Sequence, residues 1–221
     1  MRILLDARTV SHEFSGVGNY VLELVRAFSR LDADHEFVLG VWGESPLREL
    51  DLDERFRFSE LPFSHESHPL GDLWEELVLP RRAARTGVDV LHGPAFLVPT
   101  LQSRLTTVVT IHDLVAFSHP ETIPWKYAAY MRQLIRRAAR ASTRVITDSE
   151  SVRRDIHDHL GVPERKVDCI PLGVPDRFRP ADPGAVARVR SLYDIRRDYI
   201  LFVGNLEPRK NLSGLVRAFR R

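Results

Sequence analysis

Residues 144–170, RVITDSESVRRDIHDHLGVPERKVDCI, carry the clearest signal of the fold class. Its first four residues include three β-branched side chains in a row, a pattern typical of a short strand. Asp148 or Ser149 can then cap a helix, and Gly161, with Pro163 just beyond it, can end that helix. The last four residues, Val167 to Ile170, predict another short strand. A strand, a helix and a second strand in this order predict a βαβ unit with parallel strands.

The same alternation continues from this unit back to the amino terminus. Short apolar runs that favour strands lie at residues 3–5, 37–42, 88–91 and 106–111, and helical stripes lie at residues 17–31, 73–78 and 124–138. Repeated strand and helix units predict an α/β fold, a Rossmann-like parallel sheet with helices on both faces.

A proline-rich segment ends the alternation. Residues 171–183 contain four of the 14 prolines, so we expect one domain at 1–172 and a linker with the start of a second domain at 173–221. Beyond the prolines the pattern predicts a helix at 185–193, a strand at 199–204 and a helix at 212–219. One such unit cannot bury its own apolar face. It either begins a truncated second domain, which we favour, or docks on the first sheet.

Charge and composition exclude several classes of protein. The 221 residues include 32 Lys and Arg against 30 Asp and Glu, and this net charge of +2 does not favour nucleic-acid binding. No uncharged apolar run is long enough to span a membrane, and Asp6 comes too early for a signal peptide, so we expect a cytoplasmic protein. Cys169 is the single cysteine and is expected to be a buried, inert thiol.

Two glycines follow the first predicted strand, in Ser15-Gly16-Val17-Gly18. Glycine lets a ligand approach closely, and the amides at the start of a helix can bind an anionic group. The glycines could equally shape the loop and begin the helix. A dinucleotide-binding fingerprint would need a third glycine where Val21 stands, so an NAD(P)-dependent oxidoreductase is disfavoured.

Histidines stand where two predicted strands end. His92 follows one strand and His112 another, at the edge where open parallel sheets bind ligands. A histidine there can hydrogen-bond a sugar hydroxyl or move a proton, with the adjacent Asp113 to orient it. A loop histidine tied to the backbone is the alternative. No histidines or cysteines have the spacing of a zinc or iron site, so no metal site is predicted.

Two adjacent cations, Arg209 and Lys210, precede the last predicted helix. Fixed positive charges near a helix start suit a diphosphate, with arginine as a bidentate donor and lysine as a point charge. An exposed pair on an ordinary turn is the alternative.

The helix predicted at 124–144 is basic throughout. It carries Lys and Arg but no Asp or Glu, and Trp125 and Tyr127 lie near its start. Such a helix can rest on an anionic membrane or attract a lipid diphosphate, and a solvated helix face is the alternative.

Six motifs, taken in order, resemble the amino-terminal part of a retaining GT-B glycosyltransferase of family 4, which includes bacterial mannosyl- and other hexosyltransferases. They are Ser15–Tyr20, Asp89–His92, Val109–Leu114, Thr147–Ser149, Ile170–Val174 and Val203–Asn211. Each motif alone is weak, but their order and spacing are specific and they cover essentially the whole chain.

This resemblance implies that the amino-terminal domain holds the acceptor and a second Rossmann-like domain holds a nucleotide sugar. Gly16 would then lie beside the donor diphosphate, His112 would contact the transferred sugar, and Arg209 and Lys210 would neutralise the departing diphosphate without a metal. His112 and Lys210 would be catalytic; further possible cleft residues are Gly18, His92 and Asp113. The implied reaction is transfer of a hexose, with retention, to a glycan or a polyprenyl-linked acceptor, and no cofactor is implied.

The chain departs from the family pattern at three places. Ser15 and Asn205 stand where many members have glycine and arginine, and the paired glutamates of the second domain are absent up to Arg221. We therefore expect an enzyme fragment that is inactive by itself. A non-catalytic module that binds a glycan or a partner chain is the alternative.

Overall fold

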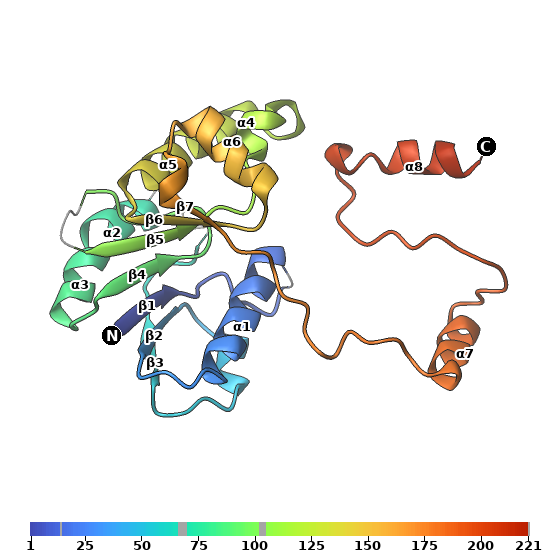
Figure 1. Ribbon diagram of the computed structural model, residues 1–221, viewed down its shortest axis with the longest axis horizontal. Coiled ribbons are helices and arrows are strands. Elements are labelled where there is room, and N and C mark those ends of the chain that lie inside the picture. Colours follow the sequence, from blue (N-terminus) through green and yellow to red (C-terminus); the bar gives the residue numbers. More distant parts are fainter. Residues whose placement is uncertain (14, 66–69, 102–104, 221) are drawn as a thin grey trace.

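The computed structural model describes residues 1–13, 15–65, 70–101 and 105–220. Within these residues a seven-stranded sheet has the order β3-β2-β1-β4-β5-β6-β7 (Figure 1). The strands are β1 (Arg2–Asp6), β2 (Glu36–Val41), β3 (Phe56–Glu60), β4 (Val90–Gly93), β5 (Thr106–Thr110), β6 (Arg144–Thr147) and β7 (Val167–Cys169). Each neighbouring pair is parallel, which confirms the predicted sheet.

Helices cover both faces of this sheet, as predicted (Figure 1). Helix α1 (Gly16–Ser29) packs Val21 and Val25 into the apolar cluster that it shares with β1 and β2. The other face is covered by α2 (Leu70–Leu77), α3 (Leu79–Arg85), α5 (Trp125–Ala141) and α6 (Glu150–Leu160). The single turn α4 (Val115–Ser118) precedes α5, and 3₁₀ turns lie at Pro46–Glu49, Pro120–Thr122, Glu164–Lys166 and Pro208–Lys210.

The ends of α6 form as the sequence predicts. Of the two candidate caps, Ser149 is the one used, because its hydroxyl accepts a hydrogen bond from the Val152 amide at 3.3 Å. Gly161 ends the helix with φ of +66°, a conformation that glycine adopts without steric cost. Asp148 is therefore free for another role.

Strand β3 was not predicted, because its apolar signal is weak. It pairs with β2 alone among the described strands and lies at the edge of the sheet, where Arg57 is exposed and only Phe56 is buried. An edge strand needs little apolar surface, so its short pattern does not stand out from a loop.

The apolar stripe predicted at residues 73–78 does form a helix, but only part of the stripe packs against the core. Trp74 packs against the core, whereas Leu73 and Leu77 are exposed on the outer face of α2. The inner face carries Gly71 and Glu75, both buried.

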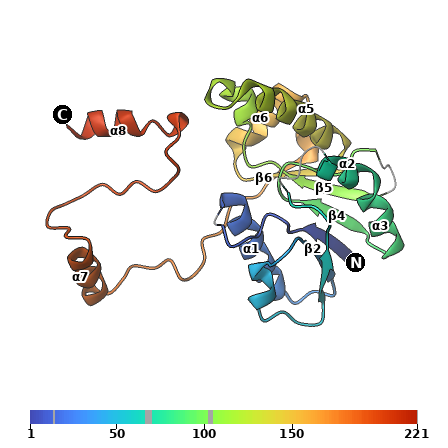
Figure 2. The same cartoon turned by 180° about the vertical axis from the view of Figure 1, so that it is seen from behind.

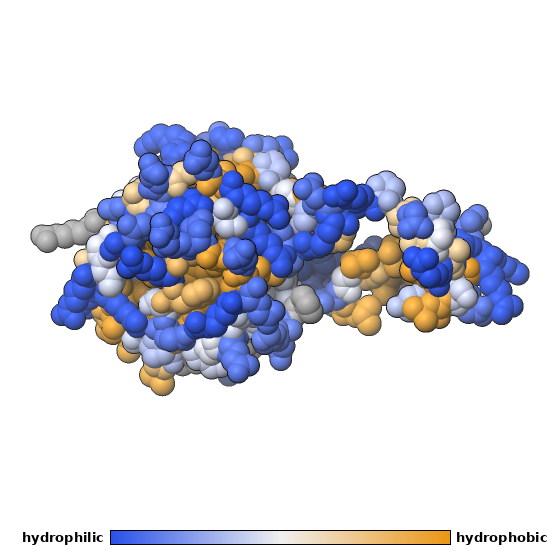
Figure 3. Space-filling view, turned by 90° about the horizontal axis from the view of Figure 1, so that it is seen from below, coloured by the Kyte–Doolittle hydropathy of each residue, from blue (hydrophilic) through white to orange (hydrophobic). Residues whose placement is uncertain are grey.

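The C-terminal arm, residues 171–220, extends away from the sheet (Figures 1 and 2). It contains the two predicted helices, α7 (Pro183–Leu192) and α8 (Leu212–Phe219). The strand predicted at 199–204 is wrong: within the described residues this segment pairs with no strand, and Val203 is 84% exposed. A strand needs a neighbour to satisfy its amides and carbonyls. Hydrophobic side chains consequently lie open along the arm (Figure 3).

Cys169 is half-buried at the end of β7, not buried as expected. Partial removal from water, then a hydrogen bond with Glu150, raises the pKa of its thiol. The thiol therefore stays protonated near neutral pH, in keeping with an unreactive side chain.

Deleting residues 173–221 should change the free energy of unfolding of the first domain by no more than about 1 kcal/mol. The arm adds no described residue to either core cluster, and its ion pair, Arg177 with Glu23 on α1, is an exposed one. Urea unfolding followed by circular dichroism measures the difference between the two chains. A loss of several kcal/mol would mean that the arm packs on the domain.

Candidate functional site

Polar side chains from several strands meet at the carboxyl edge of the sheet. His92 lies in β4, Thr110 ends β5, and Asp148 follows β6. The strands are parallel, so these ends share one edge, and α1 begins at the same edge after β1.

His112, two residues beyond β5, is held at both ring nitrogens. Its Nδ1 lies 2.7 Å from Asp148 Oδ2, and its Nε2 lies 3.0 Å from the carbonyl oxygen of Pro94. Both partners are acceptors, so the ring donates from whichever nitrogen carries a proton, and a neutral ring, with a single N–H, donates to only one of them. His112 thus presents a fixed donor at the sheet edge, and Asp148 sets its orientation.

Two aromatic rings pack against His112. Tyr20 of α1 meets the imidazole edge-on, with ring centroids 4.7 Å apart, and Phe96 does so at 5.9 Å. Because Tyr20 lies one turn after Gly16 on α1, this contact places the start of that helix beside His112.

Asp113 does not orient His112, which corrects the prediction. Its carboxylate accepts a hydrogen bond from the Val115 amide at 3.2 Å and so belongs to the turn that leads into α4. The orienting carboxylate is Asp148, which directly follows the neighbouring strand β6. The sequence contained Asp148 as a candidate helix cap, and only the pairing of β5 with β6 brings it to His112.

His92 is buried beneath this edge, where its ring is neutral near pH 7. Its Nε2 lies 2.8 Å from the hydroxyl of Thr110. Burial, followed by the nearby His112, lowers the pKa of His92 to about 4. The sequence allowed either hydrogen bonding to a sugar hydroxyl or proton transfer at this position. A neutral, buried ring favours hydrogen bonding.

The two glycines at the start of α1 have different surroundings. Ser15 caps the helix by accepting a hydrogen bond from the Gly18 amide at 2.9 Å. A Cβ at Gly18 would lie 2.5 Å from the carbonyl oxygen of Thr9, whereas a Cβ at Gly16 would meet nothing within 4 Å. Gly18 therefore allows close packing of the loop, and Gly16 faces open space at the helix start.

Gly18→Ala should destabilise the protein by about 1–3 kcal/mol, because the backbone of the loop would have to move. Gly16→Ala is the matched control, and we expect it to leave the free energy of unfolding within about 0.5 kcal/mol of the original. Urea unfolding of the 221-residue chain measures both. An equal loss in free energy of unfolding for the two variants would contradict the difference in packing between Gly16 and Gly18.

A buried ion cluster lies under the β1 end of the edge, and no local sequence pattern predicts it. Arg8 donates to Asp6 at 2.5 Å and to Glu75 of α2 at 2.6 Å, and all three side chains are nearly inaccessible. Burial, and then the charge of Asp6, raises the pKa of Glu75 to about 7. Burial opposes ionisation of Asp6 as well, but the charge and hydrogen bonds of Arg8 prevail and lower its pKa. The cluster anchors α2 to β1.

Arg209 and Lys210 are not brought to this edge. They lie in the 3₁₀ turn of the C-terminal arm, apart from the sheet (Figures 1 and 2). There Arg209 donates to Glu207 at 2.6 Å. The diphosphate role of the pair stays a prediction.

The described residues contain neither a metal-binding cluster nor a membrane-spanning helix. Among the residues that the structure describes, no three His, Cys, Asp or Glu side chains are grouped so that they could hold a metal ion. None of the helices in those residues has the length and apolarity needed to cross a bilayer.

A seven-stranded parallel sheet with helices on both faces is the Rossmann-like architecture of the amino-terminal domain of a GT-B fold. The family model for Glycosyltransferase Family 4 matches residues 14–178, and the chain belongs to this family. O-antigen chain mannosyltransferase B of Escherichia coli is 26% identical over 232 aligned residues, which cover 100% of this chain and 60% of that relative.

Solved structures share this fold. One is HepE of Anabaena in complex with UDP and glucose. The match covers 99% of this chain and 57% of the HepE chain, with a TM-score of 0.65 and 17% identity. Another is sucrose-phosphate synthase from Thermosynechococcus elongatus. The match covers 99% of this chain and 59% of the synthase chain, with a TM-score of 0.67 and 17% identity. The chain therefore spans less than two thirds of each of these proteins.

Proposed function

We propose that the protein containing this chain transfers a hexose from a nucleotide sugar to a glycan or polyprenyl-linked acceptor, with retention of configuration. The observation that carries the proposal is the placing of His112, a fixed hydrogen-bond donor, beside the open start of α1 at Gly16. A sugar diphosphate needs both features, an anion site at helix amides and a donor to a sugar oxygen. The Anabaena HepE structures with UDP and UDP-glucose support a nucleotide sugar as the ligand.

In this proposal residues of both domains contact the donor. The open space at Gly16 admits the diphosphate, and His112 exchanges its bond with the Pro94 carbonyl for one with the transferred sugar. Arg209 and Lys210 stabilise the leaving diphosphate from the second domain, with no metal required. Both substrates are thus oriented in a closed cleft, which lowers the entropic cost of reaction.

We further propose that the 221-residue chain alone does not catalyse the transfer of a hexose. Arg209 lies on the arm with Glu207 as its partner, so it offers no charge to a diphosphate at Gly16. The full-length protein should act in the cytoplasm, at the membrane where a lipid-linked acceptor is found.

Turnover by the purified full-length protein tests the proposal. Incubated with a panel of nucleotide sugars and with glycan and polyprenyl-linked acceptors, it should release a nucleoside diphosphate, and NMR of the anomeric proton should show retention. The 221-residue chain is the matched control and should release none. Consumption of no nucleotide sugar by the full-length protein would contradict transferase activity.

A further inference from the structure

Helix α2 presents an apolar stripe to solvent. Leu70, Leu73 and Leu77 recur at helical spacing and are 67%, 56% and 38% exposed, and Leu101 on the neighbouring loop is 61% exposed. The ion pair of Glu75 with Arg8 fixes the opposite face of α2 against the sheet. The stripe therefore cannot turn inward without breaking a buried ion pair.

Contacts join this stripe to α5. Glu76 of α2 accepts hydrogen bonds from the Thr100 amide at 2.7 Å and the Leu101 amide at 3.1 Å, which fixes the loop that carries Leu101. Arg137 of α5 lies 3.7 Å from Glu76 on the other side. These contacts make α2 and α5 neighbours, and we call the exposed leucines of α2 together with the outer side of α5 the α2–α5 face.

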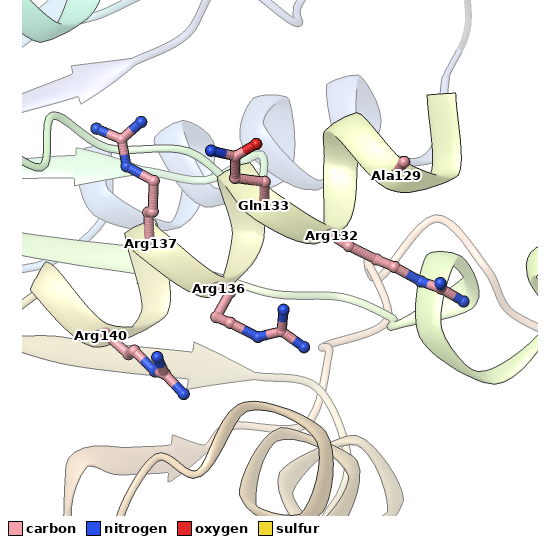
Figure 4. Close-up of a pocket in the computed structure, with 6 residues that line it drawn as sticks. All are labelled: Ala129, Arg132, Gln133, Arg136, Arg137 and Arg140. Atoms are coloured by element: carbon pink, nitrogen blue, oxygen red, sulfur yellow. The ribbon is translucent and has the colours of Figure 1, made fainter. Parts of the chain in front are cut away.

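The α5 part of this face is a row of arginines along an open hollow. Arg132, Arg136 and Arg140 lie four residues apart, and the hollow, of about 400 Å³, is also lined by Ala129, Gln133 and Arg137 (Figure 4). Arg132 and Arg140 donate to backbone carbonyls, and Arg136 lies over the ring of Phe117. None of these three arginines forms an ion pair with a described residue, so their charge is uncompensated within the part of the chain that the structure shows.

We propose that the α2–α5 face docks on the surface of an anionic lipid bilayer, with the leucines in the headgroup region and the arginines on lipid phosphates. This deepens the proposed function, since it rests on a membrane-borne acceptor. Apolar side chains beside unpaired cations match an anionic interface in both hydrophobicity and charge. Trp125, 75% exposed at the start of α5, is a residue type enriched at that depth.

Other occupants fit this face less well. The arm leaves the domain over α1, where Arg177 pairs with Glu23, and α1 covers the other side of the sheet. A second copy docked about a two-fold axis would bring arginine rows of like charge together. An anionic membrane has neither obstacle.

Co-sedimentation of the 221-residue chain with vesicles tests the proposal without any donor or acceptor. The chain should bind phosphatidylglycerol-containing vesicles at low salt and leave pure phosphatidylcholine vesicles unbound. The double substitution Arg136→Gln/Arg140→Gln should weaken binding to the anionic vesicles by about tenfold or more. High salt should abolish this difference in binding between the original chain and the variant. Leu73→Ser/Leu77→Ser should weaken it by a similar factor.

Arg188→Gln/Arg190→Gln on α7 removes the same charge from the arm and should leave binding unchanged. Circular dichroism checks that each variant is folded. Absence of binding to anionic vesicles, equal losses in the α7 variant, or a dimer that the leucine variant disperses would each overturn the proposal. Because vesicle binding needs no nucleotide sugar, failure here is distinct from failure of the transferase proposal.

Discussion

His112→Ala in the full-length protein is expected to lower kcat by about 10²-fold or more with the preferred nucleotide sugar. Alanine removes the donor that Asp148 and the Pro94 carbonyl hold in place, so charge developing on the transferred sugar or leaving group loses a fixed partner. Steady-state kinetics with varied donor separates the effect on kcat from that on KM.

Two further variants make this result specific. Asp148→Asn keeps the shape of the partner but weakens its hold on Nδ1, so kcat should fall by less than in His112→Ala. His119→Ala removes a histidine that lies on an exposed turn beside Glu121 and should not change kcat. An unchanged kcat in His112→Ala would mean that His112 has a structural role only.

Arg8→Met should cost about 3–5 kcal/mol of stability, the largest loss that we expect from one substitution in this domain. Methionine fills similar space but leaves the carboxyl groups of Asp6 and Glu75 buried without their cation. Urea unfolding of the 221-residue chain gives the difference in free energy.

Arg48→Met is the matched control for Arg8→Met. Arg48 pairs with Glu60 on the surface, and exposed pairs contribute no more than about 1 kcal/mol. If the two substitutions cost the same, the cluster of Asp6, Arg8 and Glu75 would not be the anchor of α2.

Local patterns were sufficient to predict most of the sheet. The β-branched run at β6, the cap at Ser149 and the glycine at 161 mark a βαβ unit because each acts within a few residues of itself. The same logic failed at residues 199–204, where an apolar run is necessary for a strand but a paired neighbour is needed as well. It failed at β3 for the converse reason, since an edge strand forms with little apolar signal.

The candidate site depended on long-range pairing, which a linear pattern does not contain. Gly16 and His112 were recognisable because each follows a strand, and the parallel sheet brings their ends together. The sequence predicts Asp113, the next residue along the chain, as the partner of His112, whereas the structure supplies Asp148 from 36 residues away. The pairing of Arg8 with Glu75, 67 residues apart, was equally invisible.

The proposed grip on the diphosphate can be seen in a crystal structure of the full-length protein with a bound nucleoside diphosphate. We expect one diphosphate to be held from two sides, by the amides at Gly16 and by the side chains of Arg209 and Lys210, with His112 next to the sugar position. A diphosphate bound with Arg209 and Lys210 turned to solvent, away from Gly16, would contradict this arrangement.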